Sequence, residues 1–371
     1  MLALTHSPAK AGIVSFARLI PSALFALPAG VASDRWNRKR LMIAADAVRA
    51  LAIASLVTTI LLHRAAFWQI PLVAFVEGSG LVVFSACSIG ALRAVVPPRQ
   101  LPAAVGAQRA RVSIVLLAGP PLGGALFGIA RALPFLTDFV SYAASILSLR
   151  AMRTPFQQER EVDRSPLRAQ VAEGFRFLWS QPFLRTAAFI YGGGNFAIPA
   201  VLFIVLVLGK RHGLSGGGIG ALLAAFGVCT LVGSLASPLF RRALAVRTIL
   251  LLELWAWLGT IAFLVHPSVY VLLVCILPLA VTLPVTDSVV DGYRVAITPE
   301  RMLGRVESVR SNISLLLAPL GPLAAGFLLE SFSARATVAV FTVWMLSLAV
   351  YGTVSSAIRT APSLDELADL S

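Results

Sequence analysis

The sequence predicts an all-α integral membrane protein with about eleven spanning helices, arranged as a two-half helix bundle. Hydrophobic residues make up 58% of the 371 residues and charged residues only 13%, whereas soluble domains carry about 25% charged residues. Apolar runs of about 20 residues, enough helix to cross the ~30 Å hydrocarbon core, recur along the chain. Basic residues gather between these runs. Together these observations exclude a soluble globular protein.

The predicted spans follow the apolar runs. They are residues 11–33, 41–62, 69–92, 105–129, 133–150, 184–208, 214–239, 246–265, 269–291, 306–329 and 334–357. Most contain internal Gly or Pro, which membrane helices tolerate when neighbouring groups satisfy the freed backbone atoms.

The basic residues predict the orientation of these spans. Lys and Arg concentrate in alternate connections, at residues 35–40, 93–99, 150–176, 241–247 and 294–305. Because basic loops are retained in the cytoplasm, these connections should be cytoplasmic. The same retention, together with anionic lipid headgroups, explains the net charge of +14 without a nucleic-acid partner. The three cysteines lie inside separate apolar runs, a pattern that indicates neither a disulfide nor a metal site.

A long polar segment divides the chain. Residues 151–182 contain few apolar positions until 167–179, where apolar side chains recur at helical spacing beside Arg176. This pattern predicts a cytoplasmic linker that ends in an amphipathic helix lying in the membrane interface. The expected organisation is therefore a first membrane half at 1–150, the linker, a second half at 183–358 and a cytoplasmic tail at 359–371.

An internal repeat supports two related halves. At an offset of 201 residues Pro121 coincides with Pro322, and at an offset of 203 residues Gly30 coincides with Gly233. Matches in the same order along nearly the same diagonal indicate a duplicated helical unit.

The loop between the first two spans combines a glycine, an acid and several basic residues. These residues are Gly30, Asp34, Arg35, Arg38, Lys39 and Arg40. A carboxylate where a helix meets the cytoplasm could bridge to a neighbouring helix in one conformational state only. The alternative is a solvated acid in a generic basic loop.

The Gly-x-x-x-Asp-Arg-x-x-Arg-Lys-Arg spacing resembles the loop between helices 2 and 3 of the major facilitator superfamily of transporters. Residues 27–40, 45–50, 97–104, 173–178 and 304–306 are similar to its branch of macrolide-efflux proteins and enterobactin-type siderophore exporters. The resemblance implies twelve helices in two halves and a gating role for Asp34. It also implies that this chain lacks helix 1, through a start placed too far downstream or a true truncation. Ser85–Ser88 departs from the Asn-Pro-x-Arg of relatives in helix 4.

A second resemblance involves Gly119, Pro120, Gly123 and Gly124. These residues resemble the helix-5 element of the antiporters of that superfamily. Small residues and Pro also permit simple close packing of helices, which is the alternative interpretation.

Ionisable residues inside the spans are costly and often functional. Asp46 and Arg49 are three residues apart on one helix face and should form a local ion pair. Glu77 lies eight residues past Gln69, at a depth similar to that of Arg18. A Glu77–Arg18 pair could exchange a proton or a cationic substrate, or it could be a permanent structural pair.

The function predicted from these features is secondary-active export of a small to medium organic molecule, driven by proton antiport through alternating access. No phosphate-binding loop or catalytic constellation occurs in the sequence, so neither ATP-driven transport, an enzyme nor a cofactor is expected. The expected partners are a small-molecule substrate, protons and the lipid bilayer, with a monomer in the plasma membrane. The alternatives are a truncated, non-transporting remnant and an importer of the same fold.

Overall fold

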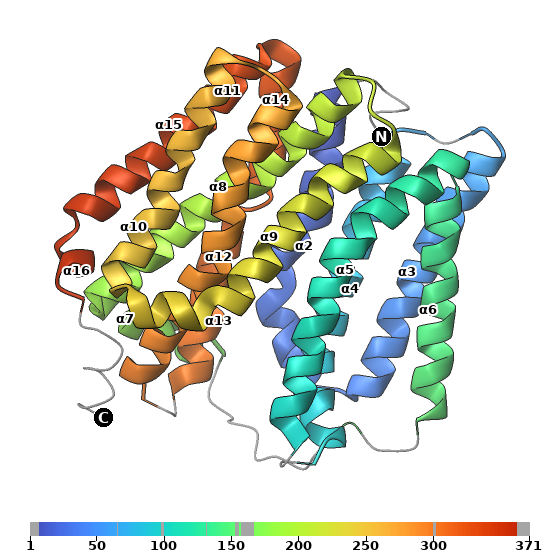
Figure 1. Cartoon of the computed structure of the whole chain (residues 1–371). Coiled ribbons are helices and arrows are strands. Elements are labelled where there is room, and N and C mark those ends of the chain that lie inside the picture. Colours follow the sequence, from blue (N-terminus) through green and yellow to red (C-terminus); the bar gives the residue numbers. More distant parts are fainter. Residues whose placement is uncertain are drawn as a thin grey trace.

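The computed structural model contains helices and no strands in the residues that it describes. These residues are 7–64, 66–97, 100–130, 132–152, 156, 167–299 and 302–361. The predicted linker residues 157–166 and tail residues 362–371 lie outside them. The structure confirms the all-α membrane fold (Figure 1).

The first group of helices comes from the N-terminal part of the chain. It consists of α2 (Pro8–Arg35), α3 (Arg38–Leu61), α4 (Gln69–Val95), α5 (Leu101–Ile129) and α6 (Leu133–Ala151). Within it α2 packs against α4, and α3 packs against both α4 and α6. The amphipathic helix α7 (Leu167–Ser180) then leads to the second group.

The second group surrounds one long helix, α8. The elements are α8 (Pro182–Arg211), α9 (Gly216–Ala243), α10 (Val246–Ala256), the 3₁₀ turn η2 (Trp257–Thr260), α11 (Ile261–Val265), α12 (Val269–Ile297), α13 (Leu303–Leu316), α14 (Leu320–Ser331), α15 (Ala334–Val354) and the short α16 (Ser356–Arg359). Helix α8 contacts α13, α14 and α15, while α9 packs along α12.

Nine segments of the described chain are long and apolar enough to cross a membrane. Two of them are interrupted helices, because η2 joins α10 to α11 and a turn at residues 317–319 joins α13 to α14. Helices α5 and α6, with 29 and 19 residues, lie alongside the others in the bundle (Figure 1). The predicted apolar runs therefore all fall on helices of the bundle.

The two groups meet along two helix pairs, α2 with α14 and α5 with α9. Small residues allow the first pair to approach closely. A Cβ atom added at Gly12 would lie 2.8 Å from the Pro322 carbonyl oxygen, and one added at Gly326 would lie 2.7 Å from the Pro8 carbonyl oxygen. Because a real side chain cannot occupy such positions, glycine permits this contact between the groups.

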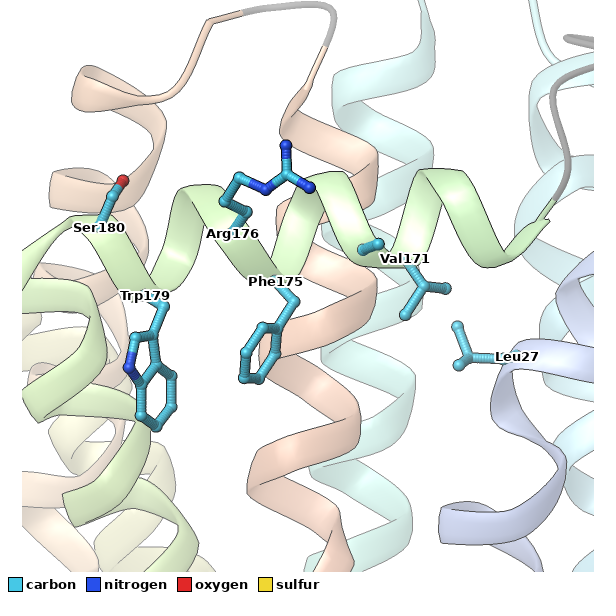
Figure 2. Close-up of a pocket in the computed structure, with 7 residues that line it drawn as sticks. Leu27, Val171, Phe175, Arg176, Trp179 and Ser180 are labelled. Carbon is cyan, nitrogen blue, oxygen red and sulfur yellow. The ribbon is translucent and has the colours of Figure 1, made fainter.

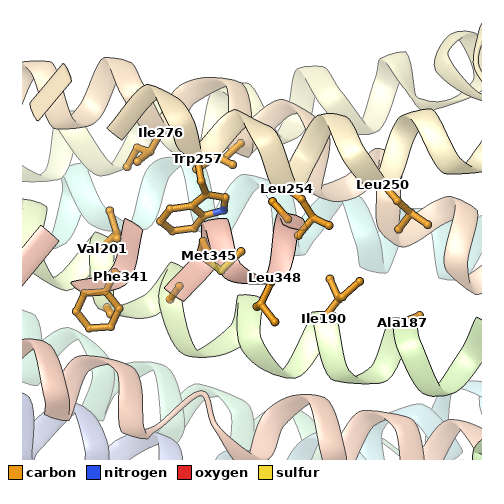
Figure 3. Packing of buried hydrophobic residues seen from close by; sticks show 14 of the residues in the cluster. Ala187, Ile190, Val201, Leu250, Leu254, Trp257, Ile276, Phe341, Met345 and Leu348 are labelled. Carbon is orange, nitrogen blue, oxygen red and sulfur yellow. The ribbon is translucent and has the colours of Figure 1, made fainter. Parts of the chain in front are cut away.

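The largest buried apolar cluster lies in the second group. Figure 3 shows Trp257, Phe341 and Met345 among neighbouring helices, and each side chain is at most 1% exposed. Since lipid is as apolar as these side chains, van der Waals packing rather than removal from water stabilises the cluster.

Large apolar side chains also cover the outer surface. Leu51, Ile129, Leu235 and Val343 are each more than 60% exposed. Exposed apolar area on this scale is unusual for a soluble protein but is expected where helices contact lipid. The surface agrees with the hydropathy of the sequence.

Helix α7 lies across the end of the bundle where α2 ends and α3 begins (Figure 1). We call this the basic end. With 14 residues, α7 is about 21 Å long and too short to span a bilayer. Glu173 forms an ion pair with Arg305 of α13, and Gly174 brings α7 against the Arg305 backbone, since an added Cβ would lie 2.7 Å from its carbonyl oxygen.

The two faces of α7 differ in chemistry. Phe175 and Trp179 stack with ring centroids 5.1 Å apart and point to one side of the helix, whereas Arg176 points to the other (Figure 2). The apolar side, with Val171 of α7 and Leu27 of α2, lines an open groove of about 900 Å³. This distribution is typical of a helix that lies in a membrane interface.

Candidate functional site

A buried ion network occupies the middle of the first group. The Arg49 guanidinium of α3 lies 3.2 Å from the Asp46 carboxylate and 3.5 Å from the Glu77 carboxylate of α4. Asp46 is 1% exposed. The spacing of three residues places Asp46 and Arg49 on one helix face, as the sequence indicates.

Helix α6 completes this network. The Tyr142 hydroxyl donates to Glu77 Oε2 at 2.8 Å and accepts from Arg49 Nη2 at 2.8 Å. The Arg49 guanidinium also lies over the Tyr142 ring, 4.3 Å from its centroid. Ser145 donates to Asp46 Oδ2 at 2.6 Å. Asp46, Arg49, Glu77, Tyr142 and Ser145 are called the Arg49 network below.

The network contains one cation between two carboxylates, so its charges do not balance when both acids are ionised. Within the described residues, Glu77 Oε1 and Arg49 Nε are buried without a hydrogen-bond partner. A buried, unpaired carboxylate oxygen is costly unless it binds a proton or another ligand. The arrangement can therefore hold one additional positive charge at Glu77.

The partner of Glu77 differs from the predicted one. Glu77 contacts Arg49, whereas the Arg18 side chain is exposed. Helices α2 and α4 nevertheless touch at the depth of these residues, because a Cβ added at Gly78 of α4 would lie 2.1 Å from the Arg18 carbonyl oxygen of α2. Arg18 instead lies within electrostatic range of Asp138 on α6. Depth along a helix was estimated correctly from the sequence, but the direction of the Arg18 side chain was not.

Arg38 begins α3, and Asp34 lies in the last turn of α2. The Asp34 carboxylate lies 3.2 Å from Arg38 Nη2 and is 64% exposed. Asn37 caps α3 by accepting from the Arg40 backbone N–H at 3.0 Å, which satisfies one of the free donors at a helix start. An ion pair with an exposed partner contributes little to stability.

Two basic residues of the loop are anchored more firmly than Asp34. Arg38 donates to the Ser33 carbonyl at 3.0 Å and to the Phe156 carbonyl at 3.3 Å. Lys39 donates to the Met152 carbonyl, just after α6, at 2.6 Å. These contacts fasten the start of α3 to the end of α6.

The remaining loop residues are less engaged. Arg35 and Arg40 are exposed, and a Cβ added at Gly30 would meet nothing within 4 Å among the described atoms. Their positions at the basic end suit contact with water and lipid headgroups. No steric requirement for glycine at position 30 is visible in this arrangement.

The helix-5 element divides into two pairs of residues. Gly124 and Pro120 face α9: a Cβ added at Gly124 would lie 2.1 Å from the Gly216 carbonyl oxygen, and one added at Gly220 would lie 2.4 Å from the Pro120 carbonyl oxygen. At Gly119 and Gly123 an added Cβ would meet nothing within 4 Å of the described structure. The element therefore forms part of the contact between the two groups.

A polar cavity of about 200 Å³ lies in the second group, and we call it the α8 cavity. Its lining residues are Ile190, Tyr191, Gly194, Asn195, Ile198, Leu250, Glu253, Leu254, Leu283, Thr286, Asp287, Arg310, Ser311, Ser314, Leu315 and Met345. Helix α8 runs unbroken through the glycines before Asn195. A Cβ added at Gly194 would meet nothing within 4 Å among the described atoms, so this glycine leaves room beside α8.

Charged residues next to the α8 cavity form a balanced group. Arg310 contacts Glu307 through two hydrogen bonds, of 2.9 and 3.0 Å, and its guanidinium lies 3.6 Å from Asp291. Arg294 forms ion pairs with Asp291, at 3.3 Å, and with Glu307. These two arginines and two acids neutralise one another.

Comparison with known proteins agrees with this architecture. The model of the Major Facilitator Superfamily matches residues 1–252. The fold resembles a bacterial homologue of the human lysosomal transporter Spinster in an inward-facing, unoccupied conformation, with a TM-score of 0.75, 18% identity and coverage of 95% of this chain and 90% of that one. It also resembles the xylose transporter XylE from E. coli, with a TM-score of 0.68, 13% identity and coverage of 98% and 89%.

The family whose model matches residues 1–252 consists of membrane transporters rather than enzymes. The chain belongs to the Major Facilitator Superfamily.

Relatives with curated names are similar over most or part of the chain. The multidrug efflux pump Tap of Mycolicibacterium fortuitum is 25% identical, covering 94% of this chain and 88% of the relative. An uncharacterized transporter, YceJ of Bacillus subtilis, is 26% identical over 90% and 84%. Macrolide efflux protein A of Streptococcus pyogenes is 27% identical over a shorter stretch, which covers 34% of this chain and 32% of the relative.

Proposed function

We propose that this protein is a secondary-active exporter of small to medium organic molecules, driven by protons that bind Glu77. The observation that carries the proposal is the Arg49 network, where one guanidinium lies between two carboxylates and Glu77 Oε1 has no partner in the described structure. Such an uncompensated acid inside a span is characteristic of proton pathways in transporters.

The network is suited to reversible protonation. Tyr142 and Arg49 both contact Glu77 Oε2, leaving Oε1 available for a proton. Protonation would weaken the attraction of Glu77 to Arg49 and so loosen the link between α3 and α4. A change in helix packing upon proton binding is what coupling to alternating access requires.

The direction of transport follows from analogy and orientation. The relatives named multidrug efflux pump and macrolide efflux protein support export rather than import. We place the basic end in the cytoplasm of a plasma-membrane protein, because Lys and Arg are retained there. Asp34 would then act at the cytoplasmic gate, with Arg38 as its partner in the state described.

Transport by purified protein in liposomes tests this function. The vesicles carry fluorescent efflux dyes such as ethidium and an imposed pH gradient of either sign. Proton antiport predicts dye movement opposite to the proton flow and its loss when nigericin collapses the gradient. Dye movement in the same direction as the protons would indicate an importer, and no gradient-dependent movement of any dye would indicate a non-transporting protein.

A further inference from the structure

We propose that the α8 cavity binds the positively charged nitrogen of an organic amine, with Glu253 and Asp287 as its counter-ions. The inference rests on the proposed transport function and names the substrate class. The two acids come from neighbouring elements, α10 and α12, and both line the same cavity. Asp287 is an exposed residue, so a ligand can reach it.

The charges that line the cavity do not balance. Its lining contains Glu253, Asp287 and Arg310 as ionisable side chains, besides the phenol of Tyr191. Arg310 is already neutralised, because its guanidinium is held by Glu307 through two hydrogen bonds. Within the described residues, neither Glu253 nor Asp287 forms a salt bridge. Two carboxylates therefore face the cavity without a cation from the protein.

An unsatisfied polar group points independently to a ligand. Ser314 is 4% exposed, and its hydroxyl has no hydrogen-bond partner in the described structure. Ser314 and Tyr191 both line the cavity, and the Tyr191 hydroxyl interacts with Asp287. Buried hydroxyl groups are normally hydrogen-bonded, so an occupant that brings a polar group or water would satisfy Ser314.

The rest of the lining determines the shape of the ligand. Apolar side chains from α8, α10 and α15, including Ile198, Leu254 and Met345, form part of the cavity lining. A charged nitrogen beside an apolar body fits a lining that combines acids with apolar side chains, whereas a metal ion would leave the apolar residues unused. With a volume of about 200 Å³, the cavity would take one amine-bearing portion of a larger molecule.

Binding to the purified protein in detergent tests this inference without any ion gradient. The probe is benzyltrimethylammonium, whose positive charge cannot be lost as a proton, and its uncharged isostere neopentylbenzene is the control ligand. We expect equilibrium binding of the cation and at least tenfold weaker binding of the isostere, because the attraction is electrostatic. Equal binding of both, or no binding of the cation, would overturn the proposal.

Variants locate the site. Asp287→Asn and Glu253→Gln keep the side-chain size and should each weaken cation binding about tenfold or more, while Asp287→Glu should largely retain it. The matched control is Asp138→Asn, an exposed acid of α6 in the other group, which should bind normally. Unchanged binding by Asp287→Asn and Glu253→Gln would contradict the assignment.

If one of these variants does not fold, the other one still tests the site. The outcome is separate from proton coupling. Dye transport that follows the pH gradient, combined with no cation binding, would retain the exporter and reject this site.

Discussion

The Arg49 guanidinium lies 3.5 Å from the Glu77 carboxylate and links α3 to α4 in the middle of the first helix group. Arg49 also holds Asp46, so a single cation serves two acids. This relationship explains why two neighbouring spans tolerate three ionisable residues, since each is satisfied in part by the others. It also leaves one carboxylate oxygen of Glu77 open to a proton.

Removing the arginine should be far more damaging than removing its acid partner. Arg49→Ala leaves Asp46 and Glu77 buried without a cation, and breaking such a pair costs about 3–5 kcal/mol. We expect a large loss of folded protein, measured by size-exclusion profile and thermal unfolding in detergent. Adding Glu77→Gln to Arg49→Ala should recover part of it.

Arg18→Ala is the matched control for this prediction, because the Arg18 side chain is exposed and contacts neither acid through an ion pair in the described structure. Its yield should be near normal. A loss for Arg18→Ala equal to that for Arg49→Ala would restore the pairing that the sequence suggested.

The contact between the groups provides a comparison of two adjacent glycines. Gly124→Ala would place a Cβ 2.1 Å from the Gly216 carbonyl oxygen, and overpacking of this kind costs about 1–3 kcal/mol. Gly123→Ala meets no described atom within 4 Å and should gain up to about 1 kcal/mol of helix propensity. Thermal unfolding should therefore shift in opposite directions, and equal shifts would show that α5 does not approach α9 this closely.

Asp34 should matter for transport and little for folding. The Asp34 side chain is 64% exposed, so Asp34→Asn should change the free energy of unfolding by less than about 1 kcal/mol. If the carboxylate holds one state of the gate, transport should fall at least about fivefold, the lower range of such coupling. Dye efflux in vesicles measures this, with unfolding of the same sample as the control. Normal efflux would remove Asp34 from the mechanism.

The orientation of the bundle can be measured in intact cells. After replacement of Cys87, Cys229 and Cys275, single cysteines at Ser180 and His212 sit at opposite ends of α8. A membrane-impermeant thiol reagent added outside should label His212→Cys and leave Ser180→Cys unmodified. The reverse pattern would place the basic end outside the cell.

The sequence was sufficient for the fold because lipid imposes a simple requirement. Each spanning segment must be a helix of about 20 mainly apolar residues. The apolar runs of the sequence therefore predict the positions of the spans. The amphipathic α7 was visible for a similar reason, since Phe175 and Arg176 fall on different faces of a helix. The sequence did not predict where η2 and the turn at residues 317–319 interrupt their spans. Gly and Pro occur in most spans and so do not mark these interruptions.

The sites were harder to predict because contacts between helices depend on rotation as well as depth. The eight-residue distance from Gln69 located Glu77 along its helix but did not select Arg49 over Arg18. Tyr142 was not identified, since an isolated tyrosine in an apolar run is common. No sequence pattern brings Glu253 and Asp287 together, because they belong to different spans. Only their convergence with Asn195 and Ser314 around one cavity distinguishes them.

The proton coupling of Glu77 is tested most directly by transport of one dye at several imposed pH gradients, in vesicles containing equal amounts of folded original protein or Glu77→Gln. The account predicts that efflux by the original protein rises with the gradient. It also predicts that Glu77→Gln shows a low rate independent of the gradient, because the glutamine cannot exchange a proton. Efflux by Glu77→Gln that still rises with the gradient would contradict it.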